Sequence, residues 1–462
     1  MAQTDWAEKE AKISNFVALF DNPDDIDPDE FKARFTALGD GPWALNAPTR
    51  AYLQALENAD SEDQVDTVIA LLDPEIAARL FRDPPHSQWI ALMLGDTSEP
   101  ERLERVFREA CDCAPDTSGP HIILVQLLEY WGRPEVARAF IDEHPKIFED
   151  PVHLLSLGEN VEIRPAERAR VERYIETLGS DASSQLRAKA LRWQLLHSDW
   201  QAAESEARRL DADSPGDEHI GGIFRQLIDA PASETQLKAL DESGEILLGH
   251  NPGDHCAVII FSGIDNQTLL RTGTFYRYLA SLGATALIVR DSRRLNYVRG
   301  LRSLAPDLDG TIVRLREIVS DLGIEKISTF GLSAGGFGAI VYGLLLRARA
   351  TLCFSPPSTM SPDIAEFDTR GSAFRRRIAR ALDEKEWDLL TWLDESSHSL
   401  PIAIYFGEDH PQDPIHAARL GDRPGVTLHP MKGVSTHSPI MTLRSPESLL
   451  KILAEGLAIP AS

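Results

Sequence analysis

The chain has 462 residues, enough for two domains, and carries a formal net charge of −25. Such an excess of negative charge repels the phosphates of nucleic acids and of anionic membranes, so neither is expected as a partner. No apolar run reaches the about 20 residues that a membrane-spanning helix needs, and the first residues show no secretory signal. We therefore expect no membrane span and a cytoplasmic location. The four cysteines follow neither a disulfide framework nor a zinc-binding pattern.

The first part of the chain, residues 1–240, is predicted to be all helical. Its apolar residues recur at helical spacing, and proline, glycine and aspartate interrupt it at short intervals. One of the predicted helices covers residues 61–81, because Ser61 starts an S-x-x-Q pattern that is typical of a helix N-terminus.

Two stretches of this part, residues 121–145 and 186–215, share one plan. Each has an apolar helix, a tight turn, and a second helix with alanine at the close-packing position before a closing proline. Both resemble a tetratricopeptide-type helical hairpin, which implies a solenoid with a continuous core. Residues 1–240 then either bind a protein partner or form an extension that shields or orients the rest, and the sequence leaves both possibilities open.

From residue 241 to 462, short apolar strands alternate with helices. This alternation is typical of a parallel sheet that is covered by helices on both faces, as in an α/β fold. The predicted strands are residues 245–250, 256–261, 284–289, 327–330, 350–355, 402–406 and 426–430. A longer polar and helical excursion occupies residues 361–399.

The motif that organises this second part lies within residues 326–346. A β-branched and aromatic strand run is followed by the G-x-S-x-G sequence GLSAG and then by a run of small and apolar residues that suits a helix. Strand, sharp turn and helix are the context of a nucleophile elbow, in which glycines remove Cβ atoms that would clash with the strained turn. Ser333 is therefore the predicted nucleophile. The Ala334 N–H, at the helix N-terminus, can face a developing oxyanion.

A serine nucleophile needs a base within hydrogen-bond reach, and the base needs an acid that orients it. Functional loops in an open parallel sheet follow the carboxyl ends of the strands. The loop after residues 402–406 offers Asp413 and Asp409. We favour Asp413, because its position just before a helix leaves a loop long enough to fold back towards the base. A helix N-cap is the competing role for Asp413, and Asp409 stays an alternative acid.

The base is predicted in the loop that follows the last strand, residues 426–430. His437 lies in this small, polar loop and is the favoured base. His429 is its rival, although it belongs to the strand. His410 and His416 flank the acid and are also expected near the site.

The order Ser333, Asp413, His437 is the chain order of α/β-hydrolases. On this order, the GLSAGG motif, the acid loop and the loop histidine, residues 245–458 resemble the α/β-hydrolase superfamily. The resemblance implies a mostly parallel sheet flanked by helices, and a helical cap inserted at residues 361–399. It also implies that the Ile264 N–H is the second oxyanion donor, although the loop lacks the family's HGGG sequence.

The predicted activity is hydrolysis of an acyl-bearing ester or thioester through an acyl-enzyme on Ser333, which requires no metal and no organic cofactor. Arg293 and Arg294 follow the strand at 284–289, so they would lie at the active-site edge and could hold an anionic substrate group. Alternatively, these arginines and Asp291 brace one another. Two further functions stay open: acyl transfer by the same triad, and a protein-interaction scaffold with a vestigial hydrolase domain.

Overall fold

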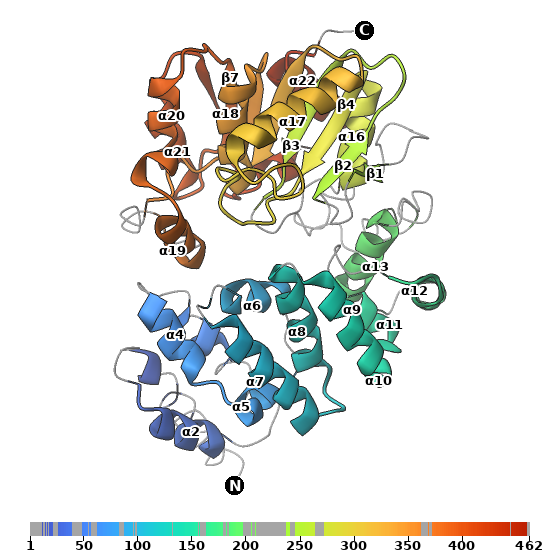
Figure 1. Ribbon diagram of the computed structural model, residues 1–462, viewed down its shortest axis with the longest axis vertical. Coiled ribbons are helices and arrows are strands. Elements are labelled where there is room, and N and C mark those ends of the chain that lie inside the picture. Colours follow the sequence, from blue (N-terminus) through green and yellow to red (C-terminus); the bar gives the residue numbers. More distant parts are fainter. Residues whose placement is uncertain are drawn as a thin grey trace. The chain divides into compact units, whose positions relative to one another are not determined.

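The computed structural model describes most of residues 12–196 and 237–459. The longer stretches outside the described residues are 1–11, 39–48, 57–61, 158–162, 264–271, 362–367 and 197–236 apart from Ser205 and Arg208. The chain divides into an N-terminal unit, residues 1–178 with 369–377, and a C-terminal unit, residues 179–368 with 378–462 (Figure 1). The boundary that the sequence predicts near residue 240 stays a prediction, because it borders the longest stretch outside the described residues.

The N-terminal unit is built of helices throughout its described part. Residues 61–81, which the sequence predicts as one helix, form two: α4 (Glu62–Ala70) and α5 (Pro74–Leu80). The break has a local cause. Asp73 is the N-cap of α5 and accepts a hydrogen bond from the Ile76 N–H, and Pro74 at the first helical position cannot continue α4.

The two helices predicted in residues 121–145 are present as α8 (Ser118–Tyr130) and α9 (Pro134–Glu143), and they pack against one another. The second hairpin of the predicted pair is represented by α13 (Ser184–Leu196) alone, which belongs to the C-terminal unit, because the residues that follow it are mostly outside the described part of the chain. The tetratricopeptide resemblance therefore stays a prediction. The other described α-helices of residues 1–178 are α2 (Pro28–Ala37), α6 (Ser87–Leu94), α7 (Pro100–Cys113), α10 (Pro145–Phe148), α11 (Pro151–Leu154) and α12 (Pro165–Thr177).

The C-terminal unit contains one eight-stranded sheet in the order β1-β2-β4-β3-β5-β6-β7-β8. Its strands are β1 (Lys238–Ala239), β2 (Ile246–Gly249), β3 (Cys256–Phe261), β4 (Ala284–Val289), β5 (Ile327–Leu332), β6 (Thr351–Phe354), β7 (Ile402–Gly407) and β8 (Val426–Met431). β2 is antiparallel to both of its neighbours, and every pair from β4 to β8 is parallel. The predicted mostly parallel sheet and all seven predicted strands are confirmed, and β1 is an additional edge strand.

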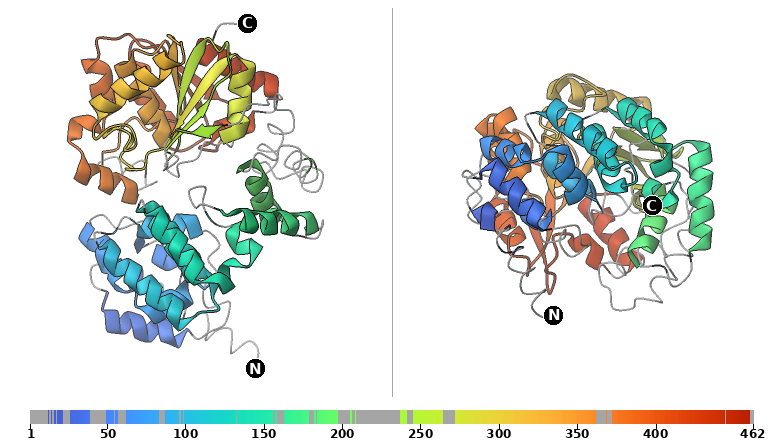
Figure 2. Two further views of the ribbon diagram at one scale, coloured as in Figure 1. Left: turned by 45° about the vertical axis from the view of Figure 1, so that its right-hand side comes forward. Right: turned by 90° about the horizontal axis from the view of Figure 1, so that it is seen from below.

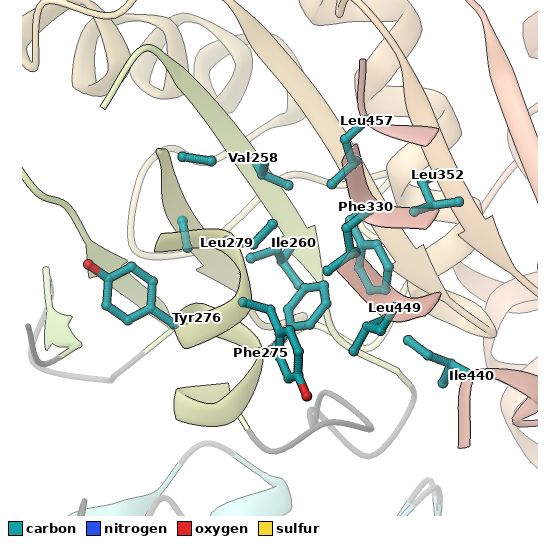
Figure 3. Packing of buried hydrophobic residues seen from close by; sticks show 14 of the residues in the cluster. Val258, Ile260, Phe275, Tyr276, Leu279, Phe330, Leu352, Ile440, Leu449 and Leu457 are labelled. Carbon is teal, nitrogen blue, oxygen red and sulfur yellow. The ribbon is translucent and has the colours of Figure 1, made fainter. Parts of the chain in front are cut away.

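Helices cover both faces of this sheet (Figures 1 and 2). On one face, α16 (Thr272–Ser281) and α22 (Pro446–Gly456) bury their apolar side chains against β3, β4, β5 and β6. Figure 3 shows this cluster, in which Phe275 of α16 and Leu449 of α22 lie near Ile260 and Phe330 of the strands. The strands are buried on both sides, which is why they have continuous apolar sequences.

The opposite face carries α18 (Ala334–Leu346), which packs on β3, β5 and β6, with α17 (Leu308–Asp321) beside it. The excursion between β6 and β7 forms α19 (Ser372–Ala381), a short 3-10 helix (Glu384–Glu386) and α20 (Leu389–Glu395). Helix α21 (Asp413–Gly421) connects β7 to β8. None of the helices in the described part of the chain is both long enough and apolar enough to cross a membrane.

Candidate active site

Ser333 occupies a strained turn between β5 and α18. Its backbone has φ 50° and ψ −128°, which L-residues rarely adopt, and it is the N-cap of α18. The two motif glycines make the turn possible. A Cβ atom on Gly331 would lie 2.1 Å from the Gly335 carbonyl oxygen, and one on Gly335 would lie 2.2 Å from the Phe261 carbonyl oxygen. Larger residues at either position would push the turn away from the sheet.

The structure brings Ser333, His437 and Asp413 together at the carboxyl edge of the sheet. His437 Nε2 lies 2.8 Å from Ser333 Oγ, and His437 Nδ1 lies 2.9 and 3.0 Å from the two carboxylate oxygens of Asp413. The Asp413 side chain is 1% exposed and the His437 side chain 32% exposed. A buried carboxylate on Nδ1 holds the proton there, which leaves the lone pair of Nε2 directed at the serine hydroxyl.

The alternative residues lie in other surroundings. Asp409 is exposed, and its N–H donates to the Val434 carbonyl oxygen. The His429 ring stacks on Tyr405 at 4.3 Å between ring centroids, and burial lowers the pKa of this histidine. His416 Nδ1 accepts a hydrogen bond from the Ser358 N–H, so this histidine ties α21 to the segment after β6. Asp413 is also the first residue of α21, although it is not its N-cap.

His410 also contacts Asp413. Its Nδ1 is 3.1 Å from Asp413 Oδ1 and 3.2 Å from the Asp413 backbone nitrogen, and its ring centroid is 5.6 Å from that of His437. Among the described residues, His410, Asp413 and His437 form the one group whose ligand atoms are close enough for a metal ion, all within 4.8 Å of one another. An ion there would replace the bond between His437 Nδ1 and Asp413, and this is the bond that orients the imidazole towards Ser333.

Of the two predicted oxyanion donors, one can be located. Ala334 is the first residue of α18, so its N–H has no acceptor within the helix and lies at the positive end of the helix dipole. Ile264 lies outside the described residues. The start of its loop is described: Ser262 is 1% exposed, and its N–H donates to the Val289 carbonyl oxygen at the end of β4.

The segment after β4 is held by its own polar groups. Buried Asp291 accepts hydrogen bonds from the backbone N–H groups of Arg293, Leu295 and Tyr297. Burial raises the pKa of Asp291, and the bonds from the N–H groups oppose that rise. The Arg293 guanidinium lies 3.2 Å from the Pro306 carbonyl oxygen, within the same connection. Asp291 thus braces the segment mainly through backbone N–H groups, and a substrate role for Arg293 and Arg294 stays a prediction.

No family model matches the chain, and no curated protein matches it. Among solved structures, the C-terminal part is similar to an S-formylglutathione hydrolase from Agrobacterium tumefaciens, with 14% identity and a TM-score of 0.35 over 48% of this chain and 94% of that one. It is similar to a truncated carbohydrate esterase from gut microbiota, with 14% identity and a TM-score of 0.36 over 50% and 100% of the two chains. It is also similar to the capsule O-acetyltransferase of Neisseria meningitidis serogroup A, with 16% identity and a TM-score of 0.34 over 45% and 91%.

These similarities are too low to decide an activity, and the fold is established by the chain itself. Its mostly parallel eight-stranded sheet carries a strained serine turn between β5 and α18, with Asp413 after β7 and His437 after β8. Strand, elbow and residue order are those expected of the superfamily that the sequence resembles. The C-terminal unit has the α/β-hydrolase fold.

Proposed function

We propose that the protein is a serine hydrolase that cleaves an ester or thioester. The observation that carries this proposal is the continuous line of hydrogen bonds from Asp413 through His437 to Ser333. The distance is 2.9 Å from Asp413 Oδ1 to His437 Nδ1 and 2.8 Å from His437 Nε2 to Ser333 Oγ. Nucleophile, base and orienting acid all lie within the range of 2.6 to 3.2 Å that proton transfer requires.

In the proposed reaction, His437 Nε2 takes the proton of Ser333 Oγ while this oxygen attacks the acyl carbonyl carbon. Asp413 holds the imidazole in the required tautomer and stabilises the imidazolium that forms. The Ala334 N–H, and in the proposal the Ile264 N–H, donate hydrogen bonds to the oxyanion. The imidazolium then protonates the leaving alcohol or thiol, and water attacks the acyl-enzyme with His437 again as the base.

The test is covalent labelling of the full chain with a fluorophosphonate, measured by intact mass. We expect the wild type to gain one adduct and Ser333→Ala to gain none. Ser328→Ala is the matched control, because Ser328 is a buried serine near the start of the same strand β5 and should not affect labelling. Absence of an adduct on folded wild-type protein would contradict the proposal.

Substrate assays then separate hydrolysis from transfer of the acyl group. p-Nitrophenyl acetate and an acetyl thioester report on the ester and thioester alternatives. Release of free acetate at the rate of ester cleavage, unchanged by added alcohols or amines, supports hydrolysis. Acetylated acceptor in place of free acetate would support acyl transfer.

A further inference from the structure

The oxyanion loop, the segment that begins at Ser262 after β3, is held from behind by a side chain with no assigned role. The Tyr297 hydroxyl lies 2.9 Å from the Ser262 carbonyl oxygen and 3.2 Å from the Val289 carbonyl oxygen, so it donates its single proton towards these two acceptors. Ser262 Oγ lies 2.9 Å from the same phenolic oxygen and donates to it. The Ser262 residue is thus bound through both its carbonyl group and its side chain.

The Ser262 carbonyl group also lies against the nucleophile elbow. A Cβ atom built on Gly335 would lie 2.4 Å from the Ser262 carbonyl oxygen, so the elbow and the oxyanion loop are in backbone contact there. The Ser262 carbonyl group therefore has both Gly335 and the Tyr297 hydroxyl close to it. The position of the Ser262 carbonyl group relative to the start of α18 therefore depends on both contacts.

Tyr297 itself is rigidly placed. It is 2% exposed and has φ 67°, a left-handed conformation that is costly for a bulky residue. Two bonds hold it there: its N–H donates to Asp291 Oδ2 at 3.0 Å, and its carbonyl oxygen accepts from the Tyr342 hydroxyl of α18 at 3.0 Å. Burial raises the pKa of Tyr297 well above its usual value, so the phenol keeps its proton at any working pH.

We propose that the Tyr297 hydroxyl is a positioning group that fixes the distance between the oxyanion loop and the nucleophile elbow. The proposal rests on the proposed function, because it assigns Tyr297 to the same site. The phenol touches no reacting atom. It acts through Ser262, by keeping the oxyanion donors where charge develops in the transition state.

The test is Tyr297→Phe in the full chain, which removes one oxygen atom and keeps the ring. Displaced oxyanion donors weaken binding of the transition state more than binding of the substrate, so kcat for p-nitrophenyl acetate should fall about ten- to hundredfold while KM changes less than about twofold. The inhibition constant of a phenylboronic acid, which forms a tetrahedral adduct on serine, should rise by a similar factor.

Tyr276→Phe is the matched control, because Tyr276 of α16 is also buried, and its hydroxyl accepts a hydrogen bond from Asn251 Nδ2 and not from the residues that hold Tyr297. It should keep kcat within about threefold of wild type even if its melting temperature falls as much as that of Tyr297→Phe. Equal losses of kcat in the two variants would overturn the proposal, since they would show general loosening of the fold.

The outcomes separate this inference from the proposed function. If the wild type neither labels at Ser333 nor turns over ester, both are overturned. If the wild type reacts and Tyr297→Phe has unchanged kcat and boronate affinity, only the role of Tyr297 is overturned. Should Tyr297→Phe fail to fold, Ser262→Ala tests the contact from the other side: a lower kcat at constant KM supports the role, and an unchanged kcat overturns it.

Discussion

Gly335 and Ser262 meet backbone to backbone, so closely that a Cβ atom on the glycine would lie 2.4 Å from the Ser262 carbonyl oxygen. The two residues are far apart in the sequence, and one belongs to the nucleophile helix while the other starts the oxyanion loop. The clash of a methyl group at this point could not be relieved by movement of a flexible side chain, because the atoms in the way are backbone atoms at the end of β3 and in the loop after it.

Gly335→Ala is therefore expected to separate the nucleophile from the oxyanion loop. We expect the rate of fluorophosphonate labelling to fall at least about a hundredfold, since an error of about 1 Å in an active site can cost that much. Gly343→Ala is the control. Gly343 lies on the same helix but distant from Ser333, and its added Cβ would meet the side chains of Thr351 and Leu400. Equal labelling rates of folded Gly335→Ala and wild type would contradict the prediction.

Asp413→Asn should lower kcat by about 10⁴-fold with little loss of stability. An amide on Nδ1 can favour the wrong tautomer of His437, in which Nε2 carries the proton and cannot accept one from Ser333. Asp409→Asn tests the other candidate acid and should keep kcat within about twofold, because Asp409 is exposed. A large loss in Asp409→Asn and a small one in Asp413→Asn would reverse the assignment.

Arg293→Gln distinguishes bracing from substrate binding. The Arg293 guanidinium donates to the Pro306 carbonyl oxygen at 3.2 Å, and loss of one such charged hydrogen bond of ~1.5 kcal/mol should lower the melting temperature by a few degrees. We expect KM for a succinyl ester and for an acetyl ester to change by the same factor. A rise in KM for the anionic ester alone, in Arg293→Gln or in Arg294→Gln, would show that these arginines bind an anionic group.

His121 makes the N-terminal unit sensitive to acid. It is fully buried in α8, its Nδ1–H donates to the Thr117 carbonyl oxygen at 2.8 Å, and its Nε2 has no partner among the described residues. Burial lowers the pKa of His121 to about 4. An unfolded histidine takes up its proton near pH 6.5. Between about pH 6.5 and 4 the unfolded state thus binds more protons, and stability falls as the pH falls.

Urea unfolding of the wild type and of His121→Gln at several pH values checks this expectation. The free energy of unfolding of the wild type should fall more steeply below pH 6.5, by up to about 1.4 kcal/mol per pH unit relative to the variant. His153→Gln is the control, because His153 also bonds a backbone carbonyl, that of Ile147 at 2.7 Å, but is only half-buried. Parallel curves for wild type and His121→Gln would contradict the prediction.

Much of the C-terminal unit could be predicted because its signals are local. The strands of a sheet that is buried on both faces are continuous apolar runs, and β3 and β4 have the bounds that the sequence predicts. The loops after β7 and β8 bring Asp413 and His437 to Ser333 because parallel strands end at one edge. The break between α4 and α5 in the N-terminal unit was not predicted, although Asp73 and Pro74 carry its local signal, an N-cap followed by a first-turn proline.

Other features have no local signal. Nothing in the sequence of β4 shows that it lies between β2 and β3, because strand order depends on how the connections pack. In the sequence, nothing distinguishes Tyr297 from an ordinary aromatic residue in a basic segment. Its bonds to Ser262 join residues 35 positions apart and require a left-handed backbone that only the fold can impose. The role of the N-terminal helices in binding a protein partner stays a prediction for the same reason, since a binding surface is a property of packed helices.

The connection between β6 and β7 has a consequence for how such a protein diversifies. The two strands are direct neighbours, with Phe354 opposite Tyr405, and a crossover between parallel strands needs only about a dozen residues. The connection in this chain is much longer than that and contains α19, a 3-10 helix and α20. Sheet pairing fixes the loops that carry Ser333, Asp413 and His437 whatever the length of this connection. Mutation can therefore lengthen, shorten or exchange this connection while the loops that carry Ser333, Asp413 and His437 keep their places.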